Sequence, residues 1–156
     1  MKKISIIFLL SLIFLNNCGF EIVNKSKLNN FKISEINTEG DNKINFRIKN
    51  KLKLISKKEE AKSIKIYLNT KKNKSVKEKN IKNEITKYEI KIITKVSYSE
   101  RSDFPSKEFK ITKSGDYKVS SQYTQTLENE KKLVRNLTDK ISDEILDELT
   151  TQLNDI

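Results

Sequence analysis

Few side chains in this chain can do chemistry: one cysteine, a group of C-terminal carboxylates and many lysines. The 156 residues include no histidine and no tryptophan. The usual nucleophile–base pairs and soft metal ligands are therefore missing. Cys18 is the only cysteine, so no disulfide can form within one chain. We expect no catalytic residue, no metal site and no cofactor.

The carboxylates are the remaining candidates for chemistry. The largest group is Asp143, Glu144, Asp147 and Glu148. A carboxylate-dependent periplasmic enzyme would need Asp143, Glu144 or Asp147 to converge in one pocket. They instead interleave with apolar residues at helical spacing, which spreads them along a surface. We expect a solvated helix face that binds a hard cation weakly at most.

Cys18 follows directly after a membrane-targeting segment. Lys2 and Lys3 precede an apolar run over residues 4–15, which is too short to span a bilayer and is typical of a secretory signal. A cysteine directly after such a signal indicates lipid attachment, with residues 1–17 removed and Cys18 as the mature N-terminus. Asn16 and Asn17 stand where small residues are usual, so an uncleaved anchor with an idle thiol stays open as the alternative.

The net charge of +11 indicates an acidic partner. Among the 32 cations only Arg47, Arg101 and Arg135 are arginine, and this lysine excess is also what an A-rich coding genome produces. For an exported protein, anionic lipid or a phosphorylated glycolipid is a more natural partner than nucleic acid.

The rest of the chain alternates between strand and helix patterns. After a lipidated N-terminus and tether over residues 18–30, residues 31–156 are expected to form one domain. Apolar alternation predicts strands near residues 31–36, 64–68, 88–98 and 109–111, the last ending at Ser114-Gly115-Asp116. Apolar residues spaced by three and four predict helices over residues 44–55, capped by Asp41 or Asn42, and about 121–153.

The basic stretch 69–83 is open to two interpretations, a hairpin loop or a frayed strand extension. The predicted order is β-α-β-β-β-α. Short connections make the last three strands antiparallel. The expected fold is α+β, a two-layer sandwich with a mostly antiparallel sheet and two helices on one face. Lys65, Lys91 and Lys95 are expected on the opposite sheet face.

With these elements in place, the chain resembles the LptE family of lipopolysaccharide-assembly lipoproteins. The resemblance rests on short pieces over most of the mature chain: Cys18-Gly19-Phe20, residues 48–52, Tyr88-Glu89-Ile90-Lys91-Ile92, Tyr117-Lys118-Val119, Tyr123, and the spacing of Leu137, Ile141, Ile145 and Leu149. It implies a protein of the outer membrane, lipid-anchored and facing the periplasm, that plugs the LptD β-barrel and binds lipopolysaccharide.

The resemblance also implies where lipopolysaccharide phosphate would bind. Family members use basic residues at the turn between the second and third strands, which here carries Lys77, Lys79, Lys82 and Lys87. Leu127 occupies a second family contact just before the final helix run, residues 137–149, where Lys131 and Lys132 are possible substitutes. A lipoprotein adaptor of another envelope lipid-transport system is the alternative function.

Overall fold

The computed structural model describes residues 31–55, 62–100 and 106–154. The elements run in the order β1 (Phe31–Gly40), α2 (Asn42–Ile55), β2 (Lys62–Lys79), β3 (Ile85–Ser99), β4 (Lys107–Lys118) and α3 (Tyr123–Asn154). This order confirms the β-α-β-β-β-α prediction. The signal segment, Cys18 and the tether lie outside the described residues.

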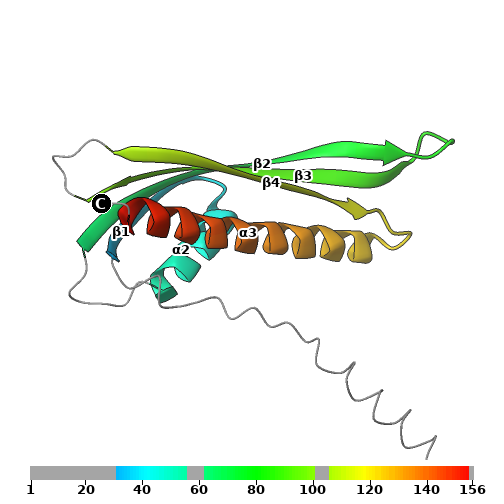
Figure 1. Cartoon of the computed structure of the whole chain (residues 1–156). Coiled ribbons are helices and arrows are strands. Elements are labelled where there is room, and N and C mark those ends of the chain that lie inside the picture. The colour runs from blue at the N-terminus through cyan, green and yellow to red at the C-terminus, as the bar shows by residue number, and fades with distance from the viewer. Residues whose placement is uncertain (1–30, 56–61, 101–105, 155–156) are drawn as a thin grey trace, which may run out of the picture.

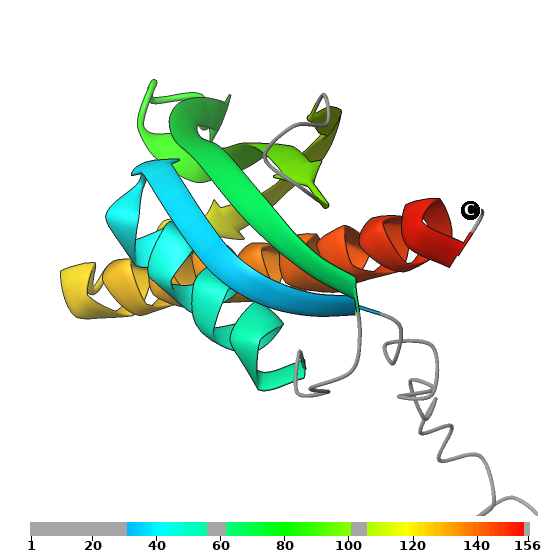
Figure 2. The same ribbon diagram turned by 90° about the vertical axis from the view of Figure 1, so that its left-hand side faces the viewer.

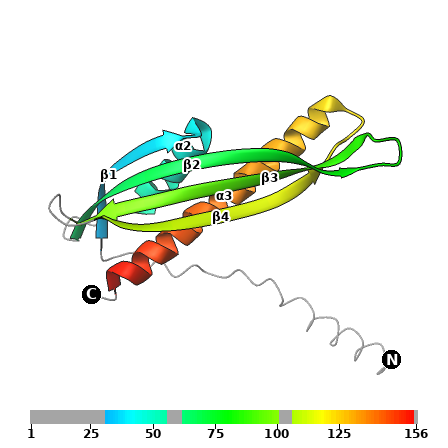
Figure 3. The same ribbon diagram turned by 90° about the horizontal axis from the view of Figure 1, so that it is seen from above.

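The four strands form one sheet in the order β1-β2-β3-β4, with both helices on one face (Figure 1). β1 pairs with β2 in parallel, while β2–β3 and β3–β4 are antiparallel. A parallel pair needs a crossover, and α2 supplies it beneath β1 and β2 (Figure 2). α3 crosses beneath the sheet diagonally (Figure 3). None of the described helices is long and apolar enough to cross a membrane.

The core lies between the sheet and the helices, as the apolar patterns predict. Its fully buried members include Ile64, Ile66 and Leu68 of β2, Ile90, Ile92 and Val96 of β3, Ile48 and Leu52 of α2, and Ile141, Ile145 and Leu149 of α3. Lys65, Lys91 and Lys95 are exposed, because they alternate with the buried residues and face away from the helices.

The turn from β1 into α2 depends on two residues. Gly40 has a φ of +92°, and a Cβ there would lie 2.0 Å from the carbonyl oxygen of Thr70. Asp41 then donates its backbone N–H to that carbonyl at 2.9 Å. The carboxylate of Asp41 accepts hydrogen bonds from the backbone of Lys43 and Ile44, each at 3.1 Å, so Asp41 is the predicted N-cap.

Two strands are longer than their apolar patterns indicate. Stretch 69–83 is largely a strand extension, since β2 continues to Lys79. The predicted strand end at Ser114-Gly115-Asp116 is wrong, because β4 runs through it to Lys118. Gly115 has no Cβ to hold α3 away: a Cβ there would lie 2.9 Å from Leu133 Cδ1. This glycine therefore marks a close helix–sheet approach instead of a turn.

Candidate ligand-binding surface

The β2–β3 hairpin continues beyond the helix layer (Figure 3). We define the hairpin extension as residues 71–79 of β2, the turn 80–84 and residues 85–89 of β3. Its base is marked by buried Thr70 and Thr94, whose hydroxyls lie 3.1 Å apart. Every residue from Lys71 to Glu84 is exposed. Residues 71–84 are therefore held mainly by strand pairing and ion pairs, whereas Tyr88 of the extension packs against the core.

Asn80 organises the turn at the tip. Its side-chain oxygen accepts the backbone N–H of Lys82 at 3.0 Å and of Glu84 at 2.9 Å. Asn83 adopts a φ of 63°, which asparagine tolerates well. Ile81, between these residues, is fully exposed. The tip thus presents one apolar side chain among lysines, a combination suited to an amphiphilic partner.

The hairpin extension brings the four predicted ligand lysines together, but acids neutralise two of them. Lys77 lies 3.4 Å from a carboxylate oxygen of Asp116 and 3.7 Å from one of Glu89. Lys87 lies 2.6 Å from Glu78. This hydrogen bond raises the pKa of Lys87 and lowers the pKa of Glu78. An anionic ligand would have to compete with these pairs.

Lys79 and Lys82 are the more available cations of the extension. Lys79 Nζ donates to the side-chain oxygen of Asn83 at 3.0 Å, which leaves its charge uncompensated. Lys82 has no side-chain partner among the described residues. Exposed ammonium groups of this kind bind phosphate as point charges.

A cluster around Lys74 joins the extension to α3. Lys74 Nζ lies 2.7 Å from Glu130 and 4.4 Å from the centre of the Tyr88 ring. Tyr117 stacks on Tyr88 and donates its hydroxyl to Glu130 at 2.8 Å. Burial raises the pKa of Glu130, but the hydrogen bonds from Lys74 and Tyr117 outweigh burial, so the net pKa is lowered. This cluster fixes the direction in which the extension leaves the domain.

The two remaining candidates, Lys131 and Lys132, lie apart from the extension on α3. Lys131 lines a groove of about 430 Å³ between α2 and α3, whereas Lys132 is exposed and does not line it. Leu127, Ile44 and Val134 supply the apolar part of the lining. The groove also carries the cations Lys43, Arg47, Lys72, Lys131 and Arg135, against the acids Asp41 and Glu130.

Sequence reasoning missed this α2–α3 groove. One feature of the sequence could have indicated it: Lys131 and Arg135 are four residues apart, so they lie on the same face of a helix. Lys72, in contrast, comes from the strand extension, and its position depends on the pairing of β2 with β3. Arg47 comes from α2, so only the packing of the two helices brings these cations together.

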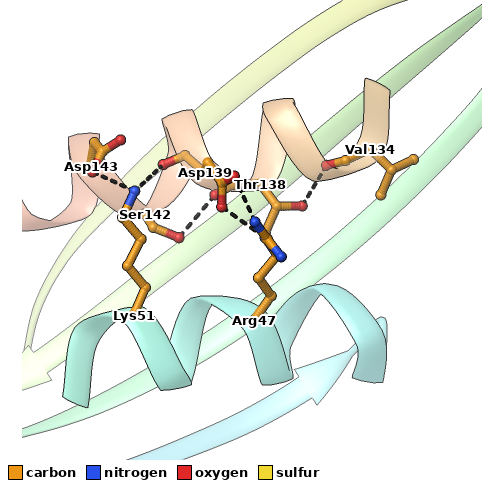
Figure 4. A network of polar contacts seen from close by, with 7 residues as sticks. All are labelled: Arg47, Lys51, Val134, Thr138, Asp139, Ser142 and Asp143. Atoms are coloured by element: carbon orange, nitrogen blue, oxygen red, sulfur yellow. Dashed lines mark hydrogen bonds and ion pairs between the residues drawn. The ribbon is translucent and has the colours of Figure 1, made fainter. Parts of the chain in front are cut away.

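Ion pairs hold the two helices together beside the groove (Figure 4). Arg47 forms two hydrogen bonds to Asp139, both of 2.7 Å, and Lys51 lies 2.6 Å from Asp143. The Arg47 guanidinium lowers the pKa of Asp139. Thr138 and Ser142 bond to carbonyls one turn back in α3, so their buried hydroxyls are satisfied within the helix.

The C-terminal carboxylates do not meet in one place. Asp143 pairs with Lys51 of α2, whereas Glu144 pairs with Lys113 of β4. Asp147 and Glu148 are both exposed residues of the same helix. The described part of the chain contains no group of three or more acids, cysteines or histidines placed to hold a metal.

The tyrosines divide between the core and the surface. Tyr98 and Tyr117 are buried, Tyr88 is partly buried against the core, and Tyr123 is 74% exposed at the start of α3. The hydroxyl of Tyr98 donates to Gln152 at 2.8 Å. Tyr88, Tyr98 and Tyr117 thus belong to the core, whereas Tyr67 of β2 is 42% exposed and donates its hydroxyl to Glu39. Tyr123 is the more exposed of the two surface tyrosines.

Sequence comparisons identify no relative: no protein-family model and no curated protein match the chain. Solved structures do match. Rare lipoprotein B from Shewanella oneidensis aligns with a TM-score of 0.60 at 16% identity, covering 77% of this chain and 97% of that one. A putative lipoprotein from Caulobacter crescentus gives 0.59 at 11% identity, covering 83% and 95%.

A third structure, an uncharacterised lipoprotein B from Nitrosomonas europaea, gives a TM-score of 0.59 at 11% identity and covers 87% of this chain and 93% of that one. The likeness extends over nearly the full length of each of the three proteins. At this level of identity the comparison establishes the architecture. The chain therefore has the fold shared by these bacterial lipoproteins.

Proposed function

We propose that this protein is an outer-membrane lipoprotein that occupies the lumen of an LptD-like β-barrel and assists the delivery of lipopolysaccharide to the outer leaflet. The observation that carries the proposal is the combination of a lipoprotein-type N-terminus with a fold shared by solved lipoproteins. In this role the lipid on Cys18 keeps the domain at the periplasmic side of the membrane, and the protein acts by binding instead of by catalysis.

The exposed sheet face supports the plug role. No second layer covers this face in the described structure, and it carries Lys65, Asn69, Lys91, Lys95 and Lys110. The lumen of a large outer-membrane barrel is lined with polar residues and water. A polar sheet face and a lysine-bearing extension are compatible with that lining, whereas an apolar face would require a second layer.

The decisive experiment is co-expression with the barrel of the same organism. Photo-crosslinkers replace Lys91 and Lys95 on the sheet face and Ile81 at the tip, with a matched control at Glu128, an exposed position of α3. We expect a 1:1 complex that survives mild detergent and crosslinks from all three positions to barrel segments. Recovery of an inner-membrane transporter without a barrel would replace this proposal with the adaptor function.

The hairpin extension is the proposed phosphate contact. Reversing Lys79 and Lys82 to Glu together is expected to weaken binding of purified lipopolysaccharide by roughly thirtyfold or more at low salt, since each cation contributes about 1 kcal/mol at an anionic surface. The loss should shrink as salt screens the charges. Neither lysine touches the core, so the thermal midpoint should not change.

The matched control for this measurement reverses Lys91 and Lys95, which are equally exposed but lie on the sheet face away from the tip. If both double variants bind lipopolysaccharide with the same affinity as the unmodified protein, the tip is only a solvated lysine stretch. If both lose affinity equally, binding follows net charge and not the extension.

A further inference from the structure

The two edges of the sheet differ in how they are protected. Strands β1 and β4 form these edges. β1 has a register irregularity between Ile33 and Glu35, and Lys49 of α2 donates to the backbone carbonyl of Ile36 at 3.1 Å. Both features hinder pairing with another strand. β4 has neither a proline nor a break in its register with β3 over its 12 residues.

The pairing of β4 with β3 fixes which backbone groups remain open. Val119 donates to the carbonyl of Thr86 at 2.9 Å, which continues the antiparallel register. Odd-numbered residues of β4 therefore bond to β3, and the even-numbered residues from Glu108 to Lys118 point their N–H and C=O groups outward. Within the described structure, the only side-chain hydrogen bond onto this edge is from Asn129 to the Lys118 carbonyl at its very end.

We propose that the β4 edge pairs with β4 of a second copy of this chain, antiparallel, with the two-fold axis at Lys113. The argument is charge complementarity. The outward-bonding residues carry their side chains on the exposed sheet face in the order Glu108, Lys110, Thr112, Ser114, Asp116, Lys118. About this axis Glu108 lies opposite the partner's Lys118, and Lys110 lies opposite the partner's Asp116. By symmetry each attractive pair forms twice.

Neighbouring registers lack this match. Moving the axis to Thr112 places Glu108 opposite the partner's Asp116, and moving it to Ser114 places Lys110 opposite the partner's Lys118. Like charges directly opposite in a sheet are destabilising. Of these three axes, only the one at Lys113 places every charged residue of the row opposite a residue of the other sign in the partner.

The helix-side residues of β4 fit the same axis. Phe109 lies opposite the partner's Tyr117, an aromatic cross-strand pair of the kind that stabilises sheets. Ile111 lies opposite the partner's Gly115, which carries no side chain of its own that could clash with it, while Leu133 packs over the glycine. The two Lys113 side chains meet on the axis, but each is already paired with Glu144 of its own α3. The result is one continuous sheet that leaves no β4 edge open.

This dimer is independent of the barrel proposal, because it concerns the protein before any 1:1 assembly. A charge-reversal series on the full-length protein in detergent tests it by analytical ultracentrifugation. Lys110→Glu should weaken the dimer about tenfold, since two attractive pairs become repulsive. Within the monomer the change is benign, because Lys110 lies opposite Lys95. Combining Lys110→Glu with Asp116→Lys should restore the dimer.

Lys91→Glu is the matched control, with the same charge change on the same face but on the interior strand β3. Lys113→Cys gives an independent readout, because a residue on the axis should form an intermolecular disulfide faster than Thr112→Cys or than the unmodified protein, whose only cysteine is Cys18. A monomer at every accessible concentration overturns the proposal. So does a dimer that Lys110→Glu weakens no more than Lys91→Glu and that Lys113→Cys does not trap.

Discussion

Replacing Gly40 with valine is expected to lower the free energy of unfolding by about 3 kcal/mol or more. A φ of +92° is unfavourable for a residue with a Cβ and worst for a β-branched one. The new Cβ would also overlap the Thr70 carbonyl at 2.0 Å, which forces apart β2 and the start of α2. The hydrogen bond from Asp41 to that carbonyl would be lost with it.

Urea denaturation followed by circular dichroism measures this loss, and Gly115→Ala is the matched control. Gly115 has no positive φ, and its nearest contact is the flexible end of Leu133. We expect Gly115→Ala to cost about 1 kcal/mol, since a terminal methyl group can move aside. An equal loss for both variants would mean that the turn after β1 is not the constraint described here.

Replacing Cys18 with alanine is expected to release the protein from membranes. The proposed anchor is a set of acyl chains attached at this residue. Each buried methylene group contributes about 0.8 kcal/mol to membrane binding, so several chains anchor the protein firmly. Without the cysteine there are no acyl chains and the anchor is lost. Radiolabelled palmitate incorporation and membrane fractionation report the change directly. We expect the domain itself to keep its thermal midpoint.

Asn17→Ala serves as the control, because a small residue before the cysteine suits a lipoprotein signal. It should take up label at least as well as the unmodified protein. An unmodified protein that incorporates no palmitate would exclude lipidation. Membrane attachment of the Cys18→Ala variant without label would instead support an uncleaved signal anchor.

Most of the fold can be predicted from local patterns of apolar residues in the sequence. The alternation in β3 and the spacing of three and four in α3 each reflect one buried face, so they predict both the element and its orientation. Asp41 is predictable as the N-cap for the same local reason. The parallel pairing of β1 with β2 follows less directly, because it depends on where the crossover helix returns the chain.

The hydrophobic pattern does not predict the distal half of β2 as a strand, and the reason is physical. Lys72 and Lys74 occupy positions on the helix-side face, where apolar residues would normally mark a strand. Glu130 and the ring of Tyr88 satisfy Lys74 there, and these partners come from α3 and β3. When the charged side chains on the helix-side face of a strand are paired with residues of other elements, the sequence alone predicts a loop. The strand can be identified only once those neighbouring elements are known.

The candidate site was predictable only as a set of cations. The lysines of the hairpin extension can be found from the sequence, yet the acids that neutralise Lys77 and Lys87 are set by cross-strand register. The α2–α3 groove combines residues from three elements. Which cations keep their charge available is therefore a property of the tertiary structure.

The hairpin extension has a consequence for how this protein can vary between species. Because residues 71–84 are exposed and, apart from Lys74 and Lys77, are held by contacts within the hairpin, most substitutions there are largely uncoupled from the stability of the core. The charge and length of the extension can then change during evolution together with its binding partner. The packed region between the sheet and the helices, on the other side of Thr70, stays constrained. Sequence divergence among relatives is expected to concentrate beyond that threonine.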